Sequence, residues 1–291
     1  MSFDLVSLAN ILIAGILTGL VYGLMALGLS VIFGVARVVN FAHGEMMTIA
    51  MYATVVLFGA FNLNPFLALF PVAAIFFALG YGLQAAVINP FVTRPDHSQF
   101  MLLLAIAIIL TNATLIIFGP DARSLRLDSL LESIELGPLL IDRGKLFAAL
   151  VACGMSAALF AFLRFTRTGT AIRACADNWL GAKITGLKVN HLYALAFGLG
   201  SACVAVAGCM TILLVDLTPN LGPAYTLLAF VIVIVGGLGS MSGALVGGVL
   251  IGVSEALAGL FIVPSAKSMF SFALLILVLL FRPRGLLGNK P

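Results

Sequence analysis

The sequence predicts an all-α polytopic membrane protein with about eight to ten membrane segments, and three observations support this class. The chain of 291 residues is 62% hydrophobic and only 9% charged, with a mean hydropathy of +1.21. A soluble globular protein has about 45–50% apolar and about 25% charged residues, so a core of this size cannot enclose the apolar runs. The runs are long enough for membrane helices, and they lack the period-two alternation of a membrane β-barrel.

Nine apolar runs are the candidate membrane segments. In chain order they cover residues 5–35, 46–61, 66–88, 100–118, 146–163, 193–215, 224–235, 243–263 and 269–281. The run 224–235 is shorter than the roughly 20 residues that a span requires, and a polar stretch at 37–45 separates the first two runs. Each of these two regions either spans or re-enters the membrane, which leaves the count between about eight and ten.

Lysine and arginine in the short loops predict the orientation of the chain. The basic loop 164–188 and the tail 282–290 are predicted to be cytoplasmic, and Arg37 and Arg94 then fall on the same side. The N-terminus and the net negative loop 120–145 are predicted to be external. The charged residues of that loop are Asp121, Arg123, Arg126, Asp128, Glu132, Glu135, Asp142, Arg143 and Lys145. The net charge of +4 is therefore interpreted as a topology signal and does not imply nucleic-acid binding.

The chain 1–291 is predicted to be one transmembrane domain that is not an enzyme. Nearly all of it is used for spans, and it contains no Gly-Lys-Ser or Gly-Lys-Thr sequence of a phosphate-binding loop. Asp4 precedes the first run without a basic stretch, so no cleavable signal peptide is expected. The four cysteines lack metal-type spacing and are interpreted as small buried hydrophobic residues: Cys153, Cys175, Cys203 and Cys209.

The segment 166–192 is the longest polar stretch with a clear positive excess. A short helix through it places apolar side chains on one stripe: Ile172, Cys175, Ala176 and Trp179. Arg173 and Asp177 fall one turn apart on the opposite side, and Gly169 and Gly181 are expected to bracket the helix. Such an amphipathic helix between two spans is typical of a part that contacts a partner. The alternative is a basic loop that only fixes the orientation.

Polar residues at membrane depth indicate function because they are costly there. Asn40 is predicted to cap a helix that begins near Phe41, with His43, Gly44 and Glu45 in its first turns. If this helix begins inside the membrane, its free N–H groups suit an anionic ligand group, and the segment borders a substrate path. The alternative is an ordinary cytoplasmic turn.

Two further polar sites lie inside apolar runs. Glu255 either lines the same pathway or forms a hydrogen bond with a neighbouring helix, and Thr111 with Asn112 is interpreted as interhelical glue. The glycines form a separate pattern, because small residues every fourth position let helices pack backbone to backbone. They are Gly15, Gly19 and Gly23 in the first run, and Gly243, Gly247, Gly248 and Gly252 in the eighth.

Three stretches together resemble one family. The first is Leu20-Val-Tyr22-Gly23-Leu-Met-Ala26-Leu-Gly28-Leu, running on to Asn40-Phe-Ala-His43-Gly44. The second is the basic segment with Arg173-Ala174, Asp177-Asn178, Ala182 and Gly186. The third is Gly236-Gly237-Leu-Gly239-Ser240, followed by Gly243, Gly247-Gly248, Gly252 and Glu255. In these stretches, and over nearly its whole length, the chain is similar to the permease subunits of bacterial ABC importers for branched-chain amino acids, the LivH type.

The resemblance implies a type II importer fold, which is a helical bundle with an inverted repeat. It implies that the loop around 172–186 is a coupling helix that docks on an ATPase subunit, through Ile172, Arg173, Ala176, Asp177, Trp179, Ala182 and Gly186. The predicted pathway residues are Asn40, His43, Gly44, Glu45 and Glu255. Helix packing is assigned to Gly19, Gly23, Gly236, Gly237, Gly239, Gly243 and Gly247.

The resemblance also implies the partners. A second, related permease would form a heterodimer with this chain in the bacterial inner membrane, two ATPase subunits would hold ATP and Mg²⁺, and a periplasmic binding protein would deliver leucine, isoleucine or valine. This chain itself would hold no cofactor. The alternatives are the same machinery for urea, short amides or other amino acids, or a stand-alone secondary transporter, for which only His43 and Glu255 offer ionisable groups.

Overall fold

The computed structural model describes residues 5–92, 94–125, 127, 130, 132–261 and 267–288. Some residues named in the sequence-based predictions lie outside this part of the chain. They are Asp4, Arg126 and Asp128 of the predicted external loop, the last residues of the run 243–263, and Lys290 of the tail.

Helices form most of the described chain, and they follow the predicted apolar runs closely. In chain order the elements are α1 (Leu5–Ala36), α2 (His43–Phe61), α3 (Pro65–Gly82), the short turns η1 (Leu83–Ile88) and η2 (Asn89–Phe91), α4 (Asp96–Phe118), β1 (Ser133–Leu136), β2 (Leu139–Asp142), α6 (Arg143–Phe165), α7 (Arg167–Asp177), α8 (Trp179–Ile184), α9 (Val189–Thr211), α10 (Leu221–Gly236), α11 (Met241–Phe261) and α12 (Lys267–Phe281). Within the described residues, seven helices are long and apolar enough to cross a membrane, and α10 and α12 are shorter apolar helices.

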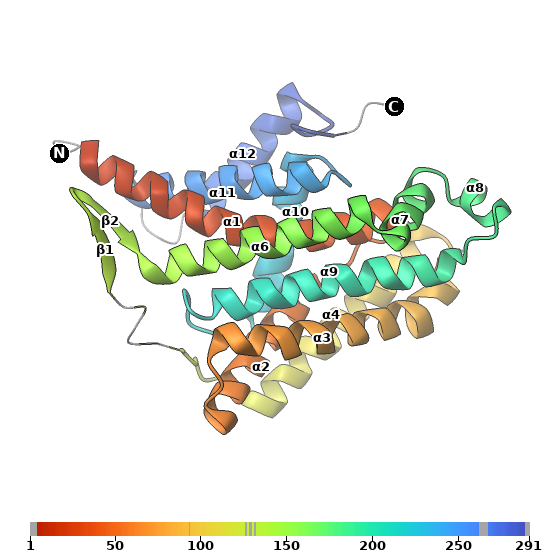
Figure 1. Ribbon diagram of the computed structural model, residues 1–291, viewed down its shortest axis with the longest axis horizontal. Helices are drawn as coiled ribbons and strands as arrows, with labels where there is room; N and C mark the ends of the chain where they lie inside the picture. Colours follow the sequence, from red (N-terminus) through yellow and green to blue (C-terminus); the bar gives the residue numbers. More distant parts are fainter. Residues whose placement is uncertain are drawn as a thin grey trace.

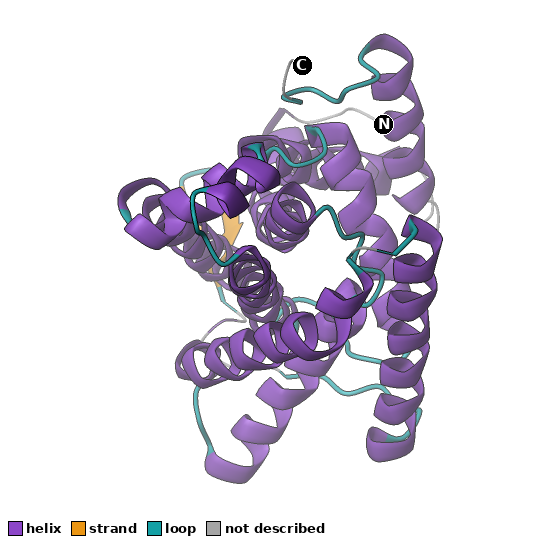
Figure 2. Ribbon diagram, turned by 90° about the vertical axis from the view of Figure 1, so that its right-hand side faces the viewer, coloured by secondary structure: helices purple, strands orange, loops and turns teal. Residues whose placement is uncertain are grey.

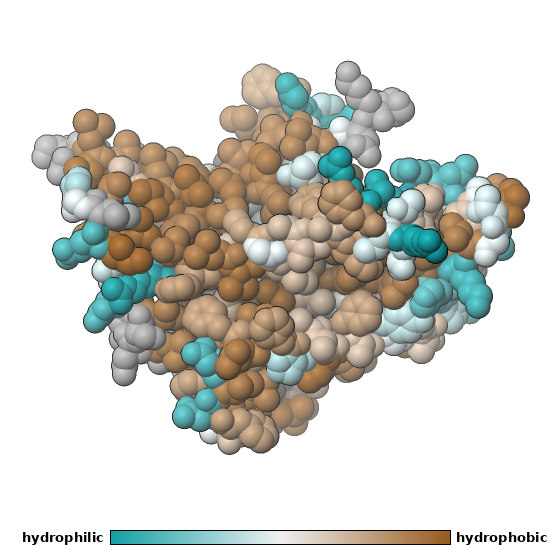
Figure 3. All heavy atoms as spheres, viewed as in Figure 1, coloured by the Kyte–Doolittle hydropathy of each residue, from teal (hydrophilic) through white to brown (hydrophobic). Residues whose placement is uncertain are grey.

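The helices α1, α3, α6, α9 and α11 lie roughly along the long axis of the molecule, whereas α10 crosses it (Figure 1). The molecule has two polar ends. α1 packs against α11, α9 and α6 (Figure 1), and a second view shows several of these helices nearly end-on (Figure 2). One end carries α7, α8 and the start of α9 and is called the basic end; the other carries β1 and β2 and is called the hairpin end. Apolar residues cover most of the visible surface between these ends (Figure 3).

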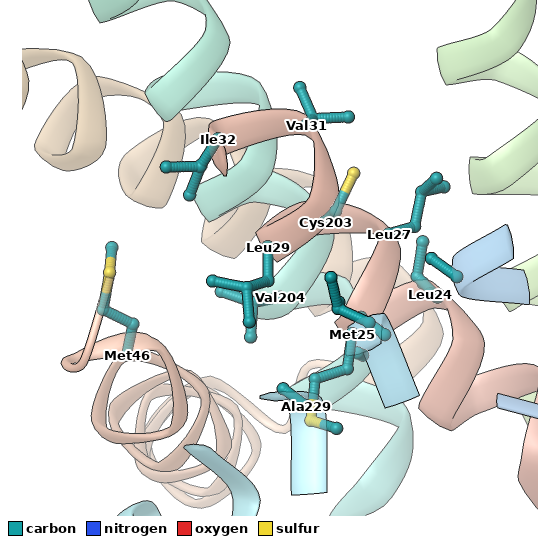
Figure 4. Close-up of a cluster of buried hydrophobic side chains, with 14 of the residues drawn as sticks. Leu24, Met25, Leu27, Leu29, Val31, Ile32, Met46, Cys203, Val204 and Ala229 are labelled. Atoms are coloured by element: carbon teal, nitrogen blue, oxygen red, sulfur yellow. The ribbon is translucent and has the colours of Figure 1, made fainter. Parts of the chain in front are cut away.

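The core lies where α1 and α9 cross. In the most apolar 18-residue stretch of α9, 89% of the residues are buried, whereas the corresponding share in α4 is 17%. The helix α9 is therefore central and α4 is peripheral. Side chains of α1, α2, α9 and α10 meet in this core (Figure 4). Gly28 and Gly200 let the two backbones touch, because a Cβ on either residue would lie 2.5 Å from the carbonyl oxygen of the other.

The loop 120–145 was predicted without regular structure, and the structure shows a β-hairpin within it. β1 and β2 pair antiparallel from Ser133 opposite Asp142 to Leu136 opposite Leu139. Gly137 supplies the positive φ of +64° that the tight turn requires. The hairpin is attached to α1, since the Leu140 amide donates to Asn10 Oδ1 at 3.0 Å. The pairing arises from short alternating segments that are too brief to stand out beside the membrane runs.

After α1 the chain turns back into the bundle before α2 begins. Arg37 ends α1 with a left-handed φ of +54°, and the Arg37 amide donates to Phe33 O at 2.9 Å. His43, the first residue of α2, bonds to the carbonyl of Met25 in the middle of α1. Met25 precedes Ala36 by 11 residues, which is about 16 Å along a helix. Residues 37–42 therefore run back by about this distance, and α2 begins midway along the bundle.

The path from α9 to α10 mirrors this arrangement. α9 runs antiparallel to α1, and after a break at 212–220 the helix α10 begins with Gly222 and Thr226 against the first turn of α2. From there α10 runs to Gly236 at the basic end, whereas α2 runs toward the hairpin end. The pairs α1–α2 and α9–α10 are thus arranged as an inverted pair, in which two interrupted helices meet midway along the bundle.

Candidate functional site

The first turns of α2 and α10 meet at a polar contact, here called the α2–α10 junction and formed by residues 40–45 with Gly222 and Thr226. The Gly44 amide donates to Thr226 Oγ1 at 2.8 Å. The same hydroxyl lies 3.1 Å from Glu45 Oε2 and 3.3 Å from Phe41 O. It has a single proton, which it can donate to either of these two oxygens. One hydroxyl of α10 therefore contacts three groups of the segment 41–45: the Gly44 amide, the Phe41 carbonyl and the Glu45 carboxyl group.

Close backbone contact makes this junction possible. A Cβ on Gly44 would overlap the carbonyl oxygen of Gly222, and a Cβ on Gly222 would lie 3.0 Å from Glu45 Cα. Glycine at both positions lets the helices approach until the Thr226 hydroxyl reaches the α2 backbone. Glu45 is only 4% exposed, so its carboxyl group is enclosed within this subunit.

The prediction that Asn40 caps a helix beginning near Phe41 is wrong. α2 begins at His43, and its N-cap is Ala42, whose side chain makes no capping bond. Asn40 Oδ1 instead accepts from the Ala42 amide at 3.1 Å, and Asn40 Nδ2 lies 3.8 Å from Met46 Sδ. The short side chain of asparagine bonds readily to the amide two residues ahead, so it stabilises the turn that enters the helix.

His43 is fully buried at the same level. Its Nε2 lies 2.9 Å from Met25 O, and because a carbonyl only accepts, Nε2 carries a proton. Its Nδ1 is buried and has no hydrogen-bond partner among the described residues. A neutral imidazole with this tautomer leaves Nδ1 as an unpaired acceptor, which is uncommon for a buried polar atom.

Glu255 lies on α11 and connects three helices. Ser271 Oγ of α12 donates to Glu255 Oε1 at 2.8 Å, and Tyr22 of α1 is hydrogen-bonded to the same carboxyl group. Tyr225, which precedes Thr226 on α10, lies close enough to interact electrostatically with Glu255. The structure therefore places Glu255 beside the start of α10, with partners on the central helix α1 and on α12.

The glycines predicted to pack helices lie along the contact between α1 and α11, here called the glycine seam. A Cβ on Gly19 would lie 2.7 Å from Val249 Cα, and one on Gly23 would lie 3.2 Å from Leu245 Cα. From the α11 side, a Cβ on Gly248 would overlap Gly23 and one on Gly252 would lie 2.5 Å from Gly19 Cα. Alanine at these positions would force the two backbones apart.

The second glycine group forms the turn between α10 and α11. A Cβ on Gly236 would overlap Gly243 O, and one on Gly247 would lie 2.6 Å from Ile232 O, so α10 and α11 pack closely. Gly237 and Gly239 have positive φ of +112° and +77°. The chain after α12 covers this turn, because the amides of Leu286 and Leu287 donate to the carbonyls of Val235 and Gly236 at 2.9 Å.

The basic segment is two helices, which corrects the single helix predicted through it. α7 ends at Asp177, and Asn178 is extended with φ −149° and ψ 94°. Asn178 Oδ1 accepts from the Gly181 amide at 2.9 Å and caps α8, which begins at Trp179. The chain breaks here because asparagine is a favourable N-cap. Trp179 therefore does not continue the apolar stripe of α7.

The two glycines that were predicted to bracket the helix, Gly169 and Gly181, lie inside α7 and α8 instead. Gly169 lies in the first turn of α7, where a Cβ would overlap Phe162 O, and the Thr166 hydroxyl accepts from its amide at 2.9 Å. Gly181 lies within α8, and the left-handed Gly186, with φ of +85°, follows it. The segment is bounded by Thr166 and Gly186, with Asn178 between its two helices.

α7 and α8 differ in what their apolar side chains contact. Ile172 and Cys175 are each 1% exposed and belong to the core of the bundle, and Ala182 of α8 is buried with them. Arg173 and Asp177 are exposed on the outer face of α7. Trp179, Leu180 and Ile184 of α8 are 52%, 52% and 78% exposed. The stripe predicted to meet a partner is thus covered by this chain, and α8 presents the free apolar surface.

Several residues of these sites were missed from the sequence. Gly200, Gly222 and Thr226 were not singled out, and Gly28 was named only within the family resemblance, without a packing role. Gly222 and Thr226 share the four-residue spacing of packing motifs. Their partners lie far away along the chain, so spacing alone gives no indication of the contact. Among the described residues, no three His, Cys, Asp or Glu side chains gather in a way that holds a metal ion.

Comparison with solved structures identifies the class of fold. The chain is similar to a chain of PsaBC from Streptococcus pneumoniae in complex with Fab, with a TM-score of 0.50 and 13% sequence identity over 95% of this chain and 92% of that chain. At this identity the likeness concerns the fold alone. It agrees with the predicted polytopic helical bundle.

Sequence comparison identifies the family. Residues 11–279 match the family described as the branched-chain amino acid transport system, permease component. The chain is 30% identical to the permease protein LivH of Salmonella typhimurium over 94% of each chain. It is also 30% identical to the permease protein BraD of Pseudomonas aeruginosa, over 96% of this chain and 95% of that one. The chain belongs to this permease family and is a multi-pass membrane protein, which confirms the family indicated by the sequence.

Proposed function

We propose that this chain is the transmembrane permease subunit of a bacterial ABC importer that moves leucine, isoleucine and valine into the cytoplasm. ATP would be hydrolysed with Mg²⁺ on two separate subunits, a related permease would complete a heterodimer, and a periplasmic binding protein would deliver the cargo. The family match over residues 11–279 carries this proposal. LivH and BraD are named as high-affinity branched-chain amino acid transport permeases.

We propose that the chain lies in the bacterial inner membrane and that its basic end faces the cytoplasm. Arg37, Lys183 and Lys188 lie at that end, and the acidic hairpin lies at the other, as the distribution of basic residues requires. We expect a Lys183→Cys variant to react with an impermeant maleimide only after the cells are opened. An Asp121→Cys variant should react in intact cells.

The native thiols allow this measurement. Cys175 is buried on α7, and burial raises the pKa of its thiol, so it should react slowly with maleimide. Cys153, which is exposed on α6, is replaced by Ala in both variants. Labelling of Lys183→Cys in intact cells would contradict the proposed orientation.

We further propose that α8 docks on an ATPase subunit. Its exposed residues Trp179, Leu180 and Ile184 form an apolar surface beside basic side chains, and large apolar side chains of this kind are common interface anchors. α7 would support α8, because Ile172 and Cys175 attach it to the bundle. In the alternative, Trp179 rests in the lipid headgroup region, where its ring is also favourable.

Replacement of Trp179 by Ala distinguishes these roles. If the ring docks, the variant should retain less ATPase subunit during purification and transport less, with a loss of about 2 kcal/mol in binding. Phe61→Ala is the control, because Phe61 is an exposed aromatic residue of α2, the helix that runs toward the opposite end. An undiminished yield of complex together with normal uptake would remove Trp179 from the docking surface.

The cargo is tested by reconstitution. Vesicles that contain the purified complex and its binding protein should accumulate leucine when ATP is inside, and excess valine or isoleucine should compete. Urea and acetamide should not compete. Transport of urea in preference to leucine would assign this chain to another member of the same class of importer.

A further inference from the structure

A large cavity lies behind α8 at the basic end. Its volume is about 650 Å³, which is within the range of sites for small ligands. The end of α1, the start of α4, both helices of the basic segment and the start of α9 form its walls. Trp179 and Lys183, one turn apart on α8, line it, whereas Leu180 and Ile184 do not. The α8 surface proposed for docking and this cavity therefore share Trp179 and differ in their other residues of α8.

The lining of this cavity is strongly positive. Arg37, Lys183 and Lys188 contribute three cationic groups, and none of the described residues that line it is an aspartate or glutamate. A neighbouring cavity of about 620 Å³ shares Arg37 but is lined by Arg173 together with Asp177, so its charges are partly balanced. The unbalanced positive charge thus belongs to the α8 cavity in particular, beyond the general basic character of this end.

Apolar residues also line this cavity, and the peripheral helix α4 contributes to its wall. Val35, Val92 and Val189 line it beside the cationic groups. Gln99 of α4 also lines it, and the following residues Phe100 and Met101 are 42% and 65% exposed on the most peripheral of the long helices. A ligand with a charged head and an apolar remainder would place each part against the matching wall.

We propose that this cavity binds the phosphate headgroup of an anionic phospholipid. The inference rests on the proposed function for one point, namely that the basic end faces the cytoplasmic leaflet. Basic pockets between membrane helices on that side are suited to acidic lipid headgroups. Arg37, Lys183 and Lys188 neutralise the phosphate, Gln99 and Asn190 offer amide donors to the glycerol oxygens, and the acyl chains lie along the exposed face of α4.

The size and composition of the cavity favour a lipid over free phosphate. Inorganic phosphate would fill only a small part of about 650 Å³ and would leave the valine side chains without contact. A lipid at this site would lie between α8 and the membrane helices, and would hold α8 at a fixed height for its ATPase partner.

The test measures lipid retained by the purified protein, together with whatever partners accompany it, by native mass spectrometry in detergent. Phosphatidylglycerol and phosphatidylethanolamine with the same acyl chains are added separately. Wild type should retain phosphatidylglycerol in preference to phosphatidylethanolamine. The Lys183→Gln/Lys188→Gln variant should lose that retention by roughly twenty-five-fold, at about fivefold for each lysine. Both lysines are exposed, so the variant should fold.

The matched control is Arg167→Gln/Arg173→Gln, which removes two charges from the same segment but none from this cavity. It should retain phosphatidylglycerol within about twofold of wild type, because a dilute lipid in detergent presents no charged surface for diffuse attraction. Equal loss in both variants, or equal retention of the two lipids by wild type, would overturn the proposal.

A competition experiment separates the two sources of phosphate. Glycerol 3-phosphate at the same concentration as the lipid should not displace phosphatidylglycerol, since it lacks the apolar part. Displacement would assign the cavity to a soluble phosphate compound and overturn the lipid. The co-purified ATPase is quantified in the same samples, so absence of an ATPase with lipid binding intact would contradict the proposed function and leave the lipid site standing.

Discussion

The glycine seam between α1 and α11 and the junction between α2 and α10 are both places where glycines bring two helices into backbone contact, yet they are held together differently. In the seam, a Cβ on any of Gly15, Gly19, Gly248 or Gly252 would lie within about 3 Å of the backbone or Cβ of the facing helix. At the junction, one threonine hydroxyl and one carboxyl group join two helices that begin midway along the bundle.

The difference follows from how helices associate in lipid. Without a hydrophobic driving force between helices, association depends on close packing and on hydrogen bonds across the contact. A seam of four contacts over several turns can separate only by losing all of them together. The junction depends on a few hydrogen bonds whose partners can be exchanged. We infer that the seam is the rigid part of the subunit and that the junction is where the substrate path changes shape.

The seam should be the most sensitive part of the molecule. In Gly248→Leu the new side chain meets the backbone of Gly23, which cannot yield as a flexible side chain would. Overpacking of a filled core costs about 1–3 kcal/mol, and a clash with backbone costs more. We expect almost no monodisperse protein by size-exclusion chromatography after extraction. Gly154→Leu is the control, since a Cβ on Gly154 meets nothing within 4 Å. Wild-type yield and melting temperature of Gly248→Leu would show that the seam is not rigid.

The junction should respond in transport more than in folding. His43→Ala removes the bond that Nε2 donates to Met25 O, a carbonyl that stays within the α1 helix. Asn40→Ala frees the Ala42 amide, at a cost of about 1–3 kcal/mol. We expect both variants to reach the membrane in normal amounts and to transport leucine several-fold more slowly. The measurement is uptake divided by the amount of protein in the membrane. Full transport by both variants would remove this segment from the path.

The contrast between these regions also shows what could be predicted from the sequence. The seam was found because Gly15, Gly19 and Gly23 recur within one helix, and a repeat of this kind is visible without any knowledge of the partner. Only one side of the junction was predicted from the sequence. Residues 40–45 stood out as polar residues between apolar runs, but Thr226 is 182 residues away from Gly44 and looks like an ordinary residue of an apolar helix.

The basic segment shows a different limit. Its apolar spacing predicted one helix from Ile172 to Trp179, and the first part of that stripe is apolar because it packs on the bundle. The break at Asn178 depends on the choice between continuing a helix and capping a new one, and local spacing does not decide it. The sequence therefore predicted an exposed apolar surface at Ile172 and Cys175, which are buried, and identified only Trp179 among the exposed apolar residues of α8.

The smallest expected effect is the most informative about the junction. Thr226→Val keeps the shape of the side chain but removes the hydroxyl that accepts from Gly44 and donates to Glu45 or Phe41. Thr48→Val is a matched control, because Thr48 is also buried and its hydroxyl donates only to Gly44 O within its own helix. A hydrogen bond between membrane helices contributes about 1 kcal/mol, so Thr226→Val should lower the melting temperature slightly more than Thr48→Val.

The decisive measurement is the rate of ATP hydrolysis by the assembled complex in the absence of cargo. If the junction holds the subunit in its resting arrangement, loss of about 1 kcal/mol from that arrangement shifts the population toward the alternative state by about fivefold. Hydrolysis without cargo should then rise by about this factor in Thr226→Val and stay unchanged in Thr48→Val. If the junction is as rigid as the seam, the two variants should hydrolyse ATP at the same rate and differ only in melting temperature, because a rigid contact loses stability without opening an alternative state.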